Sequence, residues 1–174
     1  MNKPHYIIGI DLGTKCGWAV LGNGQITDKG KRIESGTWDF KAKRHEGGGM
    51  RYVRFANALR ELLDRWDFRT GENDRSVHVA FEEVRRHRGV AAAHVYGGLM
   101  ATLQSVLEDR EYKIPYVSIP VGTIKKHATG KGNASKEEMI ASAKKEWEEE
   151  SWELADDNEA DALWVASAYC NGLF

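Results

Sequence analysis

The chain is poor in cysteine, and neither its cysteines nor its histidines show a metal-binding spacing. The two cysteines, Cys16 and Cys170, form no Cys-x-x-Cys pair, which argues against a disulfide framework and favours a reducing compartment. The six histidines include no His-Glu-x-x-His motif and no paired-ligand spacing, so we expect no zinc site. Other residue types must therefore carry any chemistry.

Long apolar segments and nucleotide-binding signatures are also missing. No stretch approaches the ~20 apolar residues of a membrane span, and the N-terminus lacks the long apolar region of a signal peptide, so we expect a cytoplasmic protein with no membrane partner. A Walker A phosphate loop is excluded because Gly132 follows Lys131 and no glycine stands at position 125. Residues 22–24, Gly-Asn-Gly, lack a third glycine at position 27 and so form no dinucleotide fingerprint.

Neither sign of charge dominates, but the two signs are separated along the chain. The 174 residues fit one domain, residues 1–174, and 41% hydrophobic and 29% charged residues are ordinary for a soluble globular protein. The net charge of -1 conceals basic segments at 31–54, 85–88 and 125–136 and an acidic segment at 146–161. Such separation suits an anionic polymer as partner.

Hydrophobic periodicity predicts a mixed α/β sheet with helices on its faces. We expect strands at 5–11, 16–21, 30–40, 77–83 and 114–119, and helices at 50–66, at 90–110, from 135 onward and at about 157–169. Ser135 and Glu138 fit a capping box at the start of one helix. Residues 41–49 form a basic, glycine-rich loop that we expect to be mobile, and no regular element is expected between residue 119 and Ser135.

Carboxylates stand where two of these strands end. Asp11 follows one apolar run, and Glu82 closes another. Because adjacent strand residues face opposite ways, only one of Glu82 and Glu83 can join Asp11, and Glu82 continues the alternation. Open α/β sheets place their sites at the carboxyl ends of strands. The alternatives are a turn in which Asp11 bonds its own backbone, and glutamates that are only solvated.

A second group of polar side chains begins the last helix. Asp157 and Asp161 are four residues apart and share a helix face, which Asn158 also joins. Alternatively, an acid that leads a helix caps it or interacts favourably with its dipole. Acids at the ends of buried elements need a cationic partner, and Mg²⁺ prefers such hard oxygen ligands together with phosphate oxygens.

Two lysines could supply positive charge near these acids. Lys125 and Lys136 flank a stretch whose glycines, Gly130 and Gly132, let the backbone approach a phosphate. Lys136 also lies on the apolar stripe of its helix, one turn before Ile140. The alternative is that these lysines are only solvated.

Together these stretches resemble the RuvC family of Holliday junction resolvases, within the ribonuclease H-like superfamily. Residues 9–14 resemble the family's first strand with its metal-binding aspartate, residues 79–84 the strand whose glutamate corresponds to Glu82, residues 125–136 the lysine-bearing stretch, and residues 159–163 the C-terminal acidic motif. The resemblance implies a ribonuclease H-like mixed five-stranded sheet flanked by helices. The short length and divergent surface resemble a phage-encoded member, which would act in the host cytoplasm.

The sequence departs from the family pattern at two positions. The family often carries a second acid three residues before its last aspartate, and here that residue is Asn158. Either Asp157 replaces it, or Asn158 ligates through its carbonyl oxygen or through a water. The family also often has an aromatic residue three positions after the glutamate, to stack on junction bases, and here that residue is Arg85.

The resemblance implies a Mg²⁺-dependent crossover junction endodeoxyribonuclease that acts on four-way or branched DNA. Two Mg²⁺ ions about 4 Å apart in each active site, replaceable by Mn²⁺, would let water displace the 3′ oxygen and leave a 5′ phosphate. The expected metal ligands are Asp11, Glu82 and Asp161, with Asp157 or Asn158. The expected catalytic residues are Asp11, Glu82, Asp157, Asp161 and Lys136. Lys136 would offset charge that develops at the scissile phosphate.

The resemblance also implies partners. The expected DNA-binding residues are Lys43, Arg44, Arg85, Arg86, Arg88, Lys125, Lys131 and Lys136. Symmetric nicks require two active sites, so we expect a homodimer. Its interface would use the small residues of the helix predicted at 90–110, which are Ala92, Ala93, Gly97, Gly98 and Ala101. The alternative is that this face packs only on the protein's own sheet.

Two other functions compete with this one. A protein that binds junctions without cutting them is one alternative, and it gains weight from Asn158, which stands where the family often has an acid. An actin-like or sugar-kinase-like phosphotransferase would use a similar Asp-Leu-Gly-Thr turn to hold nucleotide phosphate, but such chains are far longer and carry a second such half.

Overall fold

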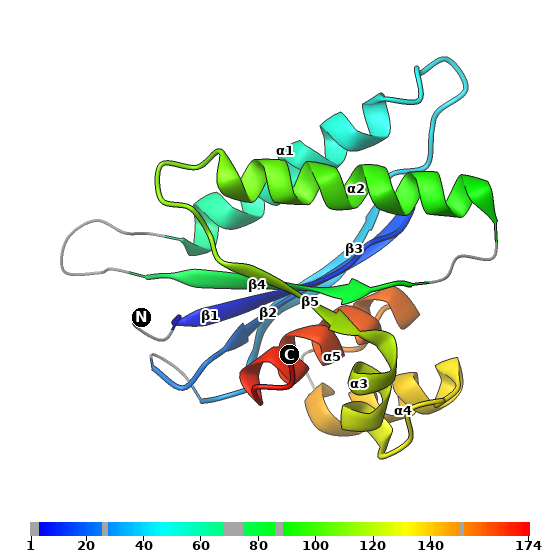
Figure 1. Cartoon of the computed structure of the whole chain (residues 1–174). Helices are drawn as coiled ribbons and strands as arrows, with labels where there is room; N and C mark the ends of the chain where they lie inside the picture. Colours follow the sequence, from blue (N-terminus) through cyan, green and yellow to red (C-terminus); the bar gives the residue numbers. More distant parts are fainter. Residues whose placement is uncertain (1–3, 26–27, 68–74, 86–88, 150–151) are drawn as a thin grey trace.

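The computed structural model describes residues 4–25, 28–67, 75–85, 89–149 and 152–174. Within these ranges, five strands form one sheet in the order β3-β2-β1-β4-β5, which confirms the expected sheet. The strands are β1 (Tyr6–Asp11), β2 (Lys15–Gly22), β3 (Arg32–Asp39), β4 (Val77–Glu83) and β5 (Tyr116–Pro120). The helices are α1 (Met50–Trp66), α2 (Val90–Glu108), α3 (Val121–Thr129), α4 (Lys136–Trp147) and α5 (Asp157–Cys170) (Figure 1).

The direction of the strands decides where their ends meet. Strand β1 is central; it runs antiparallel to β2 and parallel to β4, and β4 runs parallel to β5. Because β3 runs antiparallel to β2, it points the same way as β1. Four strands therefore end at one edge of the sheet, which we call the carboxyl edge. The loops that follow β1, β3 and β4 all leave from this edge.

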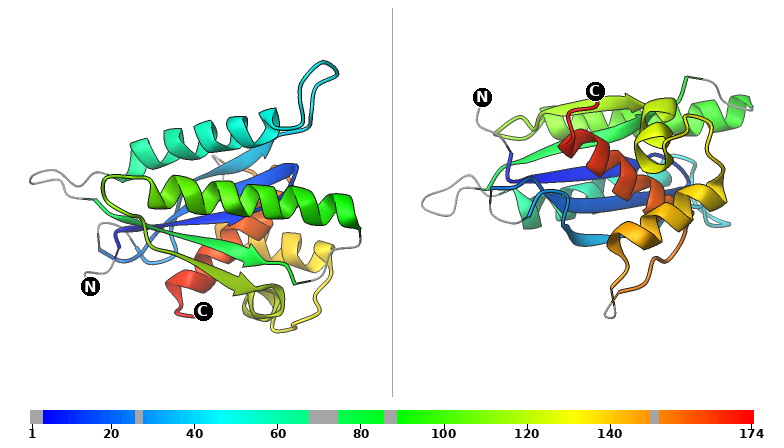
Figure 2. Two further views of the ribbon diagram at one scale, coloured as in Figure 1. Left: turned by 45° about the horizontal axis from the view of Figure 1, so that its top comes forward. Right: turned by 90° about the horizontal axis from the view of Figure 1, so that it is seen from below.

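Helices cover both faces of the sheet. Helices α1 and α2 lie on one face, and α3, α4 and α5 lie on the other (Figures 1 and 2). Alternate residues of β1 enter the two cores: Ile8 and Ile10 pack with Leu59 on the α1 side, while Ile7 packs with Leu163 of α5. This burial on both faces explains why β1 reads as a continuous apolar run rather than an alternating one.

Helix α3 was not expected from the sequence, which suggested no regular element between residue 119 and Ser135. It begins directly after Pro120, and it ends where Gly130 adopts a positive φ of 81°, a conformation that favours glycine. Ile124 is its buried residue. Its nine residues are shorter than the span over which apolar periodicity identifies a helix.

Helix α2 is unusual because no charged residue occurs from Val90 to Leu107. Among the described residues it is the one helix that is long and apolar enough to cross a membrane, judged by length and composition alone. This segment departs from the expectation that no stretch approaches a membrane span, and the expectation of no membrane partner stays a prediction. Leu99 and Leu103 are fully buried against the sheet and α1, but only 22% of the apolar segment is buried. An exposed, uncharged face therefore remains.

Candidate active site

The parallel pairing of β1 and β4 places two carboxylates side by side at the carboxyl edge. Ile10 pairs with Phe81, and Asp11 and Glu82 are the next residues on their strands. Both side chains face α5, because Gly9 and Ala80, two residues earlier on their strands, face that helix. Glu83 points to the other face, where its Oε2 lies 3.1 Å from Arg85 Nη2. The choice of Glu82 over Glu83 as the partner of Asp11 agrees with this arrangement.

Two glycines let α5 bring its own acids to the same place. A Cβ added at Gly17, the residue opposite Asp11 on β2, would lie 1.8 Å from the carbonyl oxygen of Asn158. A Cβ added at Gly9 would lie 2.2 Å from the carbonyl oxygen of Ala162. The backbone of α5 therefore rests directly on β1 and β2. Its first two turns, which carry Asp157 and Asp161, lie over the end of β1.

A pocket of about 340 Å³ opens where these elements meet. Its charged lining consists of Glu82, Lys125, Lys136, Asp157 and Asp161, and its apolar lining consists of Val121, Ile124 and Met139. The apolar wall comes mostly from α3, so the sequence analysis missed it together with that helix. Asp11 does not line the pocket, but it lies close enough for the charges of Glu82 and Asp161 to act on it.

Burial and crowding change the acidity of these carboxyl groups. Burial, followed by the charges of Glu82 and Asp161, raises the pKa of Asp11 well above its usual value. Burial and the charge of Asp161 raise the pKa of Glu82 to about 7. Burial and the charge of Asp157 raise the pKa of Asp161 to about 6. Acidic groups that repel one another in a partly buried site favour the binding of a cation there.

Two lysines supply the nearby positive charge. Lys125 Nζ donates a hydrogen bond to the carbonyl oxygen of Ala134 at 2.8 Å, and its charge opposes the rise in the pKa values of Glu82 and Asp161. Lys136 Nζ lies 2.5 Å from Asp157 Oδ2. The Lys136 side chain is 60% exposed, so it reaches the pocket along its rim rather than from within the core.

Asp156, which the sequence analysis did not single out, fixes the start of α5. Its Oδ1 accepts hydrogen bonds from the backbone N–H of Glu159 at 2.9 Å and from Thr37 Oγ1 at 2.7 Å. The Asn158 side chain also bonds to Asp156, and Asn158 does not line the pocket. The sequence contains a signal for this role, because Asp156 followed three residues later by Glu159 resembles a capping box. The N-cap role considered for Asp157 thus belongs to Asp156.

The carboxylates converge without forming a closed metal cage. Among the described residues, no three His, Cys, Asp or Glu side chains are grouped closely enough to hold a metal ion. The oxygen donors are nevertheless of the type that Mg²⁺ prefers, and Mg²⁺ commonly keeps several waters and takes only one or two carboxylates directly. In donor chemistry and in charge, the residues therefore fit this metal.

The expected DNA-binding residues lie in several separate parts of the chain. Lys125 and Lys136 line the pocket, whereas Lys131 Nζ lies 2.8 Å from Glu138 and outside the lining. Arg85 follows β4 at the carboxyl edge and is exposed. Lys43 and Arg44 lie in the loop between β3 and α1. Arg86 and Arg88 lie outside the described residues.

Comparison with known proteins finds similarity to Holliday junction resolvases. The crossover junction endodeoxyribonuclease RuvC of Synechococcus sp. (strain WH7803) is 30% identical over 163 residues, which cover 92% of this chain and 94% of that protein. RuvC of Thermus thermophilus, solved with a Holliday junction substrate, has a TM-score of 0.72 and 22% identity over 97% of this chain and 93% of its own.

More distant structures share the fold. The yeast mitochondrial Holliday junction resolvase Ydc2 has a TM-score of 0.62 and 15% identity over 98% of this chain and 80% of its own. A fowlpox virus resolvase, solved with Holliday junction DNA, has a TM-score of 0.57 and 12% identity over 96% of this chain and 99% of its own. No family model matches the sequence. On the evidence of its fold, its converging carboxylates and its similarity to the Synechococcus protein over nearly the whole chain, this protein belongs to the RuvC family.

Proposed function

We propose that this protein is a structure-selective endonuclease that resolves Holliday junctions and related branched DNA by metal-dependent hydrolysis, leaving 5′ phosphate ends. The observation that carries the proposal is that acids from β4 and α5 line a pocket together with Lys125 and Lys136, and that Asp11 of β1 lies close enough to feel the charges of Glu82 and Asp161. A site that only bound DNA phosphate would gain nothing from acids gathered so closely that the charges of some raise the pKa values of others.

Mg²⁺, with Mn²⁺ as a substitute and two ions per site, is the cofactor that we propose. Asp11, Glu82 and Asp161 would hold it, and Asp157 is the better placed of the two further candidates because it lines the pocket and Asn158 does not. When bound, the metal would polarise the scissile phosphate and lower the pKa of water. Because burial and the charge of Asp161 raise the pKa of Glu82 to about 7, metal binding at neutral pH would release a proton from this group.

The other residues of the pocket have separate tasks in this reaction. Lys136, on the exposed rim, would release Asp157 and approach the scissile phosphate, where its charge stabilises the additional negative charge of the transition state. Lys125 is held by the carbonyl oxygen of Ala134 and so presents a fixed charge behind the phosphate. The apolar wall of Val121, Ile124 and Met139 would restrict bulk water.

A homodimer built on α2 is part of the proposal. Of the small residues expected at an interface, Gly98 already packs within the chain, since a Cβ added there would lie 2.5 Å from the Tyr52 ring. Ala92 and Ala101 are exposed, and within the described structure no atom lies within 4 Å of a Cβ added at Gly97. The helix thus uses one part of its small-residue surface internally and leaves another part open to a second copy.

A junction-cleavage assay tests the proposal. A synthetic four-way junction should be cut in Mg²⁺ and left intact in EDTA, and Asp11→Asn should lower the cleavage rate at least ~10³-fold while junction binding persists. Asp109→Asn, an exposed acid just after α2, is the matched control and should cut at the wild-type rate. Cleavage by the Asp11→Asn protein would contradict the proposed mechanism. Binding without any cutting by the wild type would favour a junction-binding protein.

A further inference from the structure

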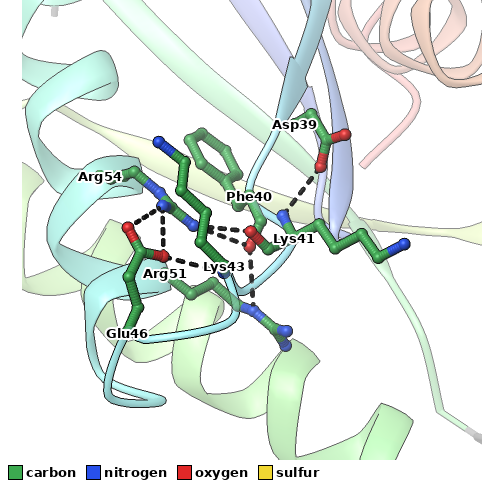
Figure 3. Close-up of polar contacts among 7 residues, drawn as sticks. All are labelled: Asp39, Phe40, Lys41, Lys43, Glu46, Arg51 and Arg54. Atoms are coloured by element: carbon green, nitrogen blue, oxygen red, sulfur yellow. Dashed lines mark hydrogen bonds and ion pairs between the residues drawn. The ribbon is translucent and has the colours of Figure 1, made fainter.

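The loop between β3 and α1 forms a second pocket, separate from the one that contains the carboxylates. This pocket has a volume of about 420 Å³ and is lined by Asp39, Lys41, Ala42, Lys43 and Arg54. The glycine-rich composition of residues 41–49 predicts a loose segment, but several side chains hold it in one conformation (Figure 3).

Arg54, on the first turns of α1, makes the central contacts. Its Nη1 donates to both carboxylate oxygens of Glu46, at 2.7 and 2.6 Å, and its Nη2 donates to the carbonyl oxygens of Phe40 at 3.4 Å and Lys41 at 2.9 Å. The two terminal nitrogens of the guanidinium thus join Glu46 to the first residues of the loop, while the buried Nε has no hydrogen-bond partner within the described residues. Charge-assisted hydrogen bonds of this kind are stronger than neutral ones.

The backbone beside Arg54 is tied down as well. The Arg51 Nε donates to the carbonyl oxygen of Phe40 at 3.3 Å, and the N–H of Lys41 donates to Asp39 Oδ1 at 2.8 Å. The N–H of Lys43 donates to Glu46 Oε2 at 3.0 Å. Both lysines that line the pocket thus leave from a fixed backbone, and only their side chains remain free to move (Figure 3).

The charge that remains is positive. Within the described parts of the chain, no carboxylate forms an ion pair with the ammonium group of Lys41 or Lys43. Figure 3 shows both ammonium groups away from the dashed contacts. Glu46 pairs with Arg54, and Asp39 adds one negative charge to the lining, so the two lysines leave a net positive charge. The first turn of α1 contains no acidic residue, so its positive N-terminal end adds to this charge.

The loop lies on the same side of the molecule as the carboxylates. The N–H of Phe40 donates to the carbonyl oxygen of Thr14 at 2.8 Å, in the turn that follows Asp11, and Asp39 pairs with Lys15. The loop therefore leaves from the carboxyl edge, on the β3 side of Asp11, while α3 and α4 lie on the β5 side. A DNA strand that crosses the edge at Asp11 can continue toward this loop.

We infer that the loop of residues 41–49 is a preorganised clamp for the phosphodiester backbone of a DNA arm, with Lys41 and Lys43 as the contacts and with Arg54 and Glu46 as positioning residues. This inference rests on the proposed function and adds to it a second, remote contact with the substrate. Ordering the loop before binding lowers the entropy cost of the contact. Neither lysine needs to reach the scissile phosphate.

Salt-dependent binding tests the contacts. Affinity is measured in EDTA, for a four-way junction and for a plain duplex with the sequence of one arm, over a range of salt concentrations. The double variant Lys41→Gln/Lys43→Gln should bind both DNAs about tenfold more weakly at ~0.1 M salt, and the slope of log affinity against log salt should flatten by about 2. An unchanged slope would overturn the inference.

The Glu46→Gln variant separates a positioning role from simple charge. Removing an acid near DNA should strengthen binding if only net charge matters. If Glu46 holds Arg54 and the loop, binding should instead weaken about threefold or more, with an unchanged salt slope because no phosphate contact is removed directly. Glu61→Gln, an exposed acid farther along α1, is the control and should not weaken binding. Tighter binding by Glu46→Gln would contradict the clamp.

The outcome for the clamp can be told apart from the outcome for cleavage. All binding is measured without a divalent metal, so the result does not depend on hydrolysis. A wild-type protein that binds DNA through Lys41 and Lys43 but never cuts would support the clamp and contradict the proposed nuclease activity. A protein that cuts junctions in Mg²⁺ but binds with unaltered affinity and slope after both lysines are replaced would keep the nuclease and remove the clamp.

Discussion

Glu82 shows at the scale of one residue how the site depends on its surroundings. Burial and the charge of Asp161 raise its pKa to about 7, so without a divalent cation the folded protein keeps a proton that the unfolded chain loses near pH 4.5. The folded state then binds more protons than the unfolded state between these two values. Linkage therefore requires that the free energy of unfolding falls as pH rises through this window.

A thermal or urea unfolding series in EDTA, from pH 4.5 to 8, checks this sign. The Glu82→Gln protein, which mimics the neutral acid, should be more stable than the wild type at pH 8 by roughly 2 kcal/mol and should lose less stability across the window. Glu83→Gln is the matched control, because the neighbouring acid points to the other face. Parallel curves for wild type and Glu82→Gln would show that Glu82 titrates normally.

At the scale of elements, the contact of α5 with the sheet decides whether the acids meet. Gly9→Ala would put a methyl group 2.2 Å from the carbonyl oxygen of Ala162, so α5 must move away from β1. We expect a loss of about 3 kcal/mol in the free energy of unfolding and a loss of cleavage. Gly122→Ala in α3 is the control: its Cβ would have its nearest neighbour at 3.9 Å, and it should leave stability unchanged or raise it by up to about 1 kcal/mol. Urea midpoints measure both.

Most of the elements could be predicted from sequence, but the geometry of the site could not. The strand that ends at Asp11 and the one that ends at Glu82 have strong apolar runs, and the capping box at Ser135 is confirmed by both of its hydrogen bonds. Helix α3 was missed because its nine residues are shorter than the span over which apolar periodicity identifies a helix. The roles of Gly9 and Gly17 became visible only when α5 was known to cross β1 and β2.

At the scale of the whole molecule, hydrogen bonds link helix α2 to the strand that carries Glu82 of the candidate active site. Tyr96 on α2 donates a hydrogen bond from its hydroxyl to the carbonyl oxygen of Glu82 at 2.8 Å and accepts one from the N–H of Val84 at 3.3 Å. The helix that we propose as the dimer interface thus also forms hydrogen bonds with the carboxyl end of β4. Dimerisation would steady the strand that carries Glu82 as well as supply a second site for the opposite DNA strand.

A charge placed on the exposed face of α2 tests the dimer. Ala101→Glu should convert a dimer into a monomer in sedimentation equilibrium, because burying an unpaired carboxylate in an apolar interface costs several kcal/mol, while the circular dichroism spectrum stays that of the wild type. Ala141→Glu, at an exposed alanine of α4, should remain dimeric. Because a monomer presents one active site, Ala101→Glu should convert paired cuts in a cruciform plasmid into single nicks. A wild-type chain that is monomeric at tens of micromolar, or paired cutting by the monomeric variant, would show that α2 does not bring two sites together.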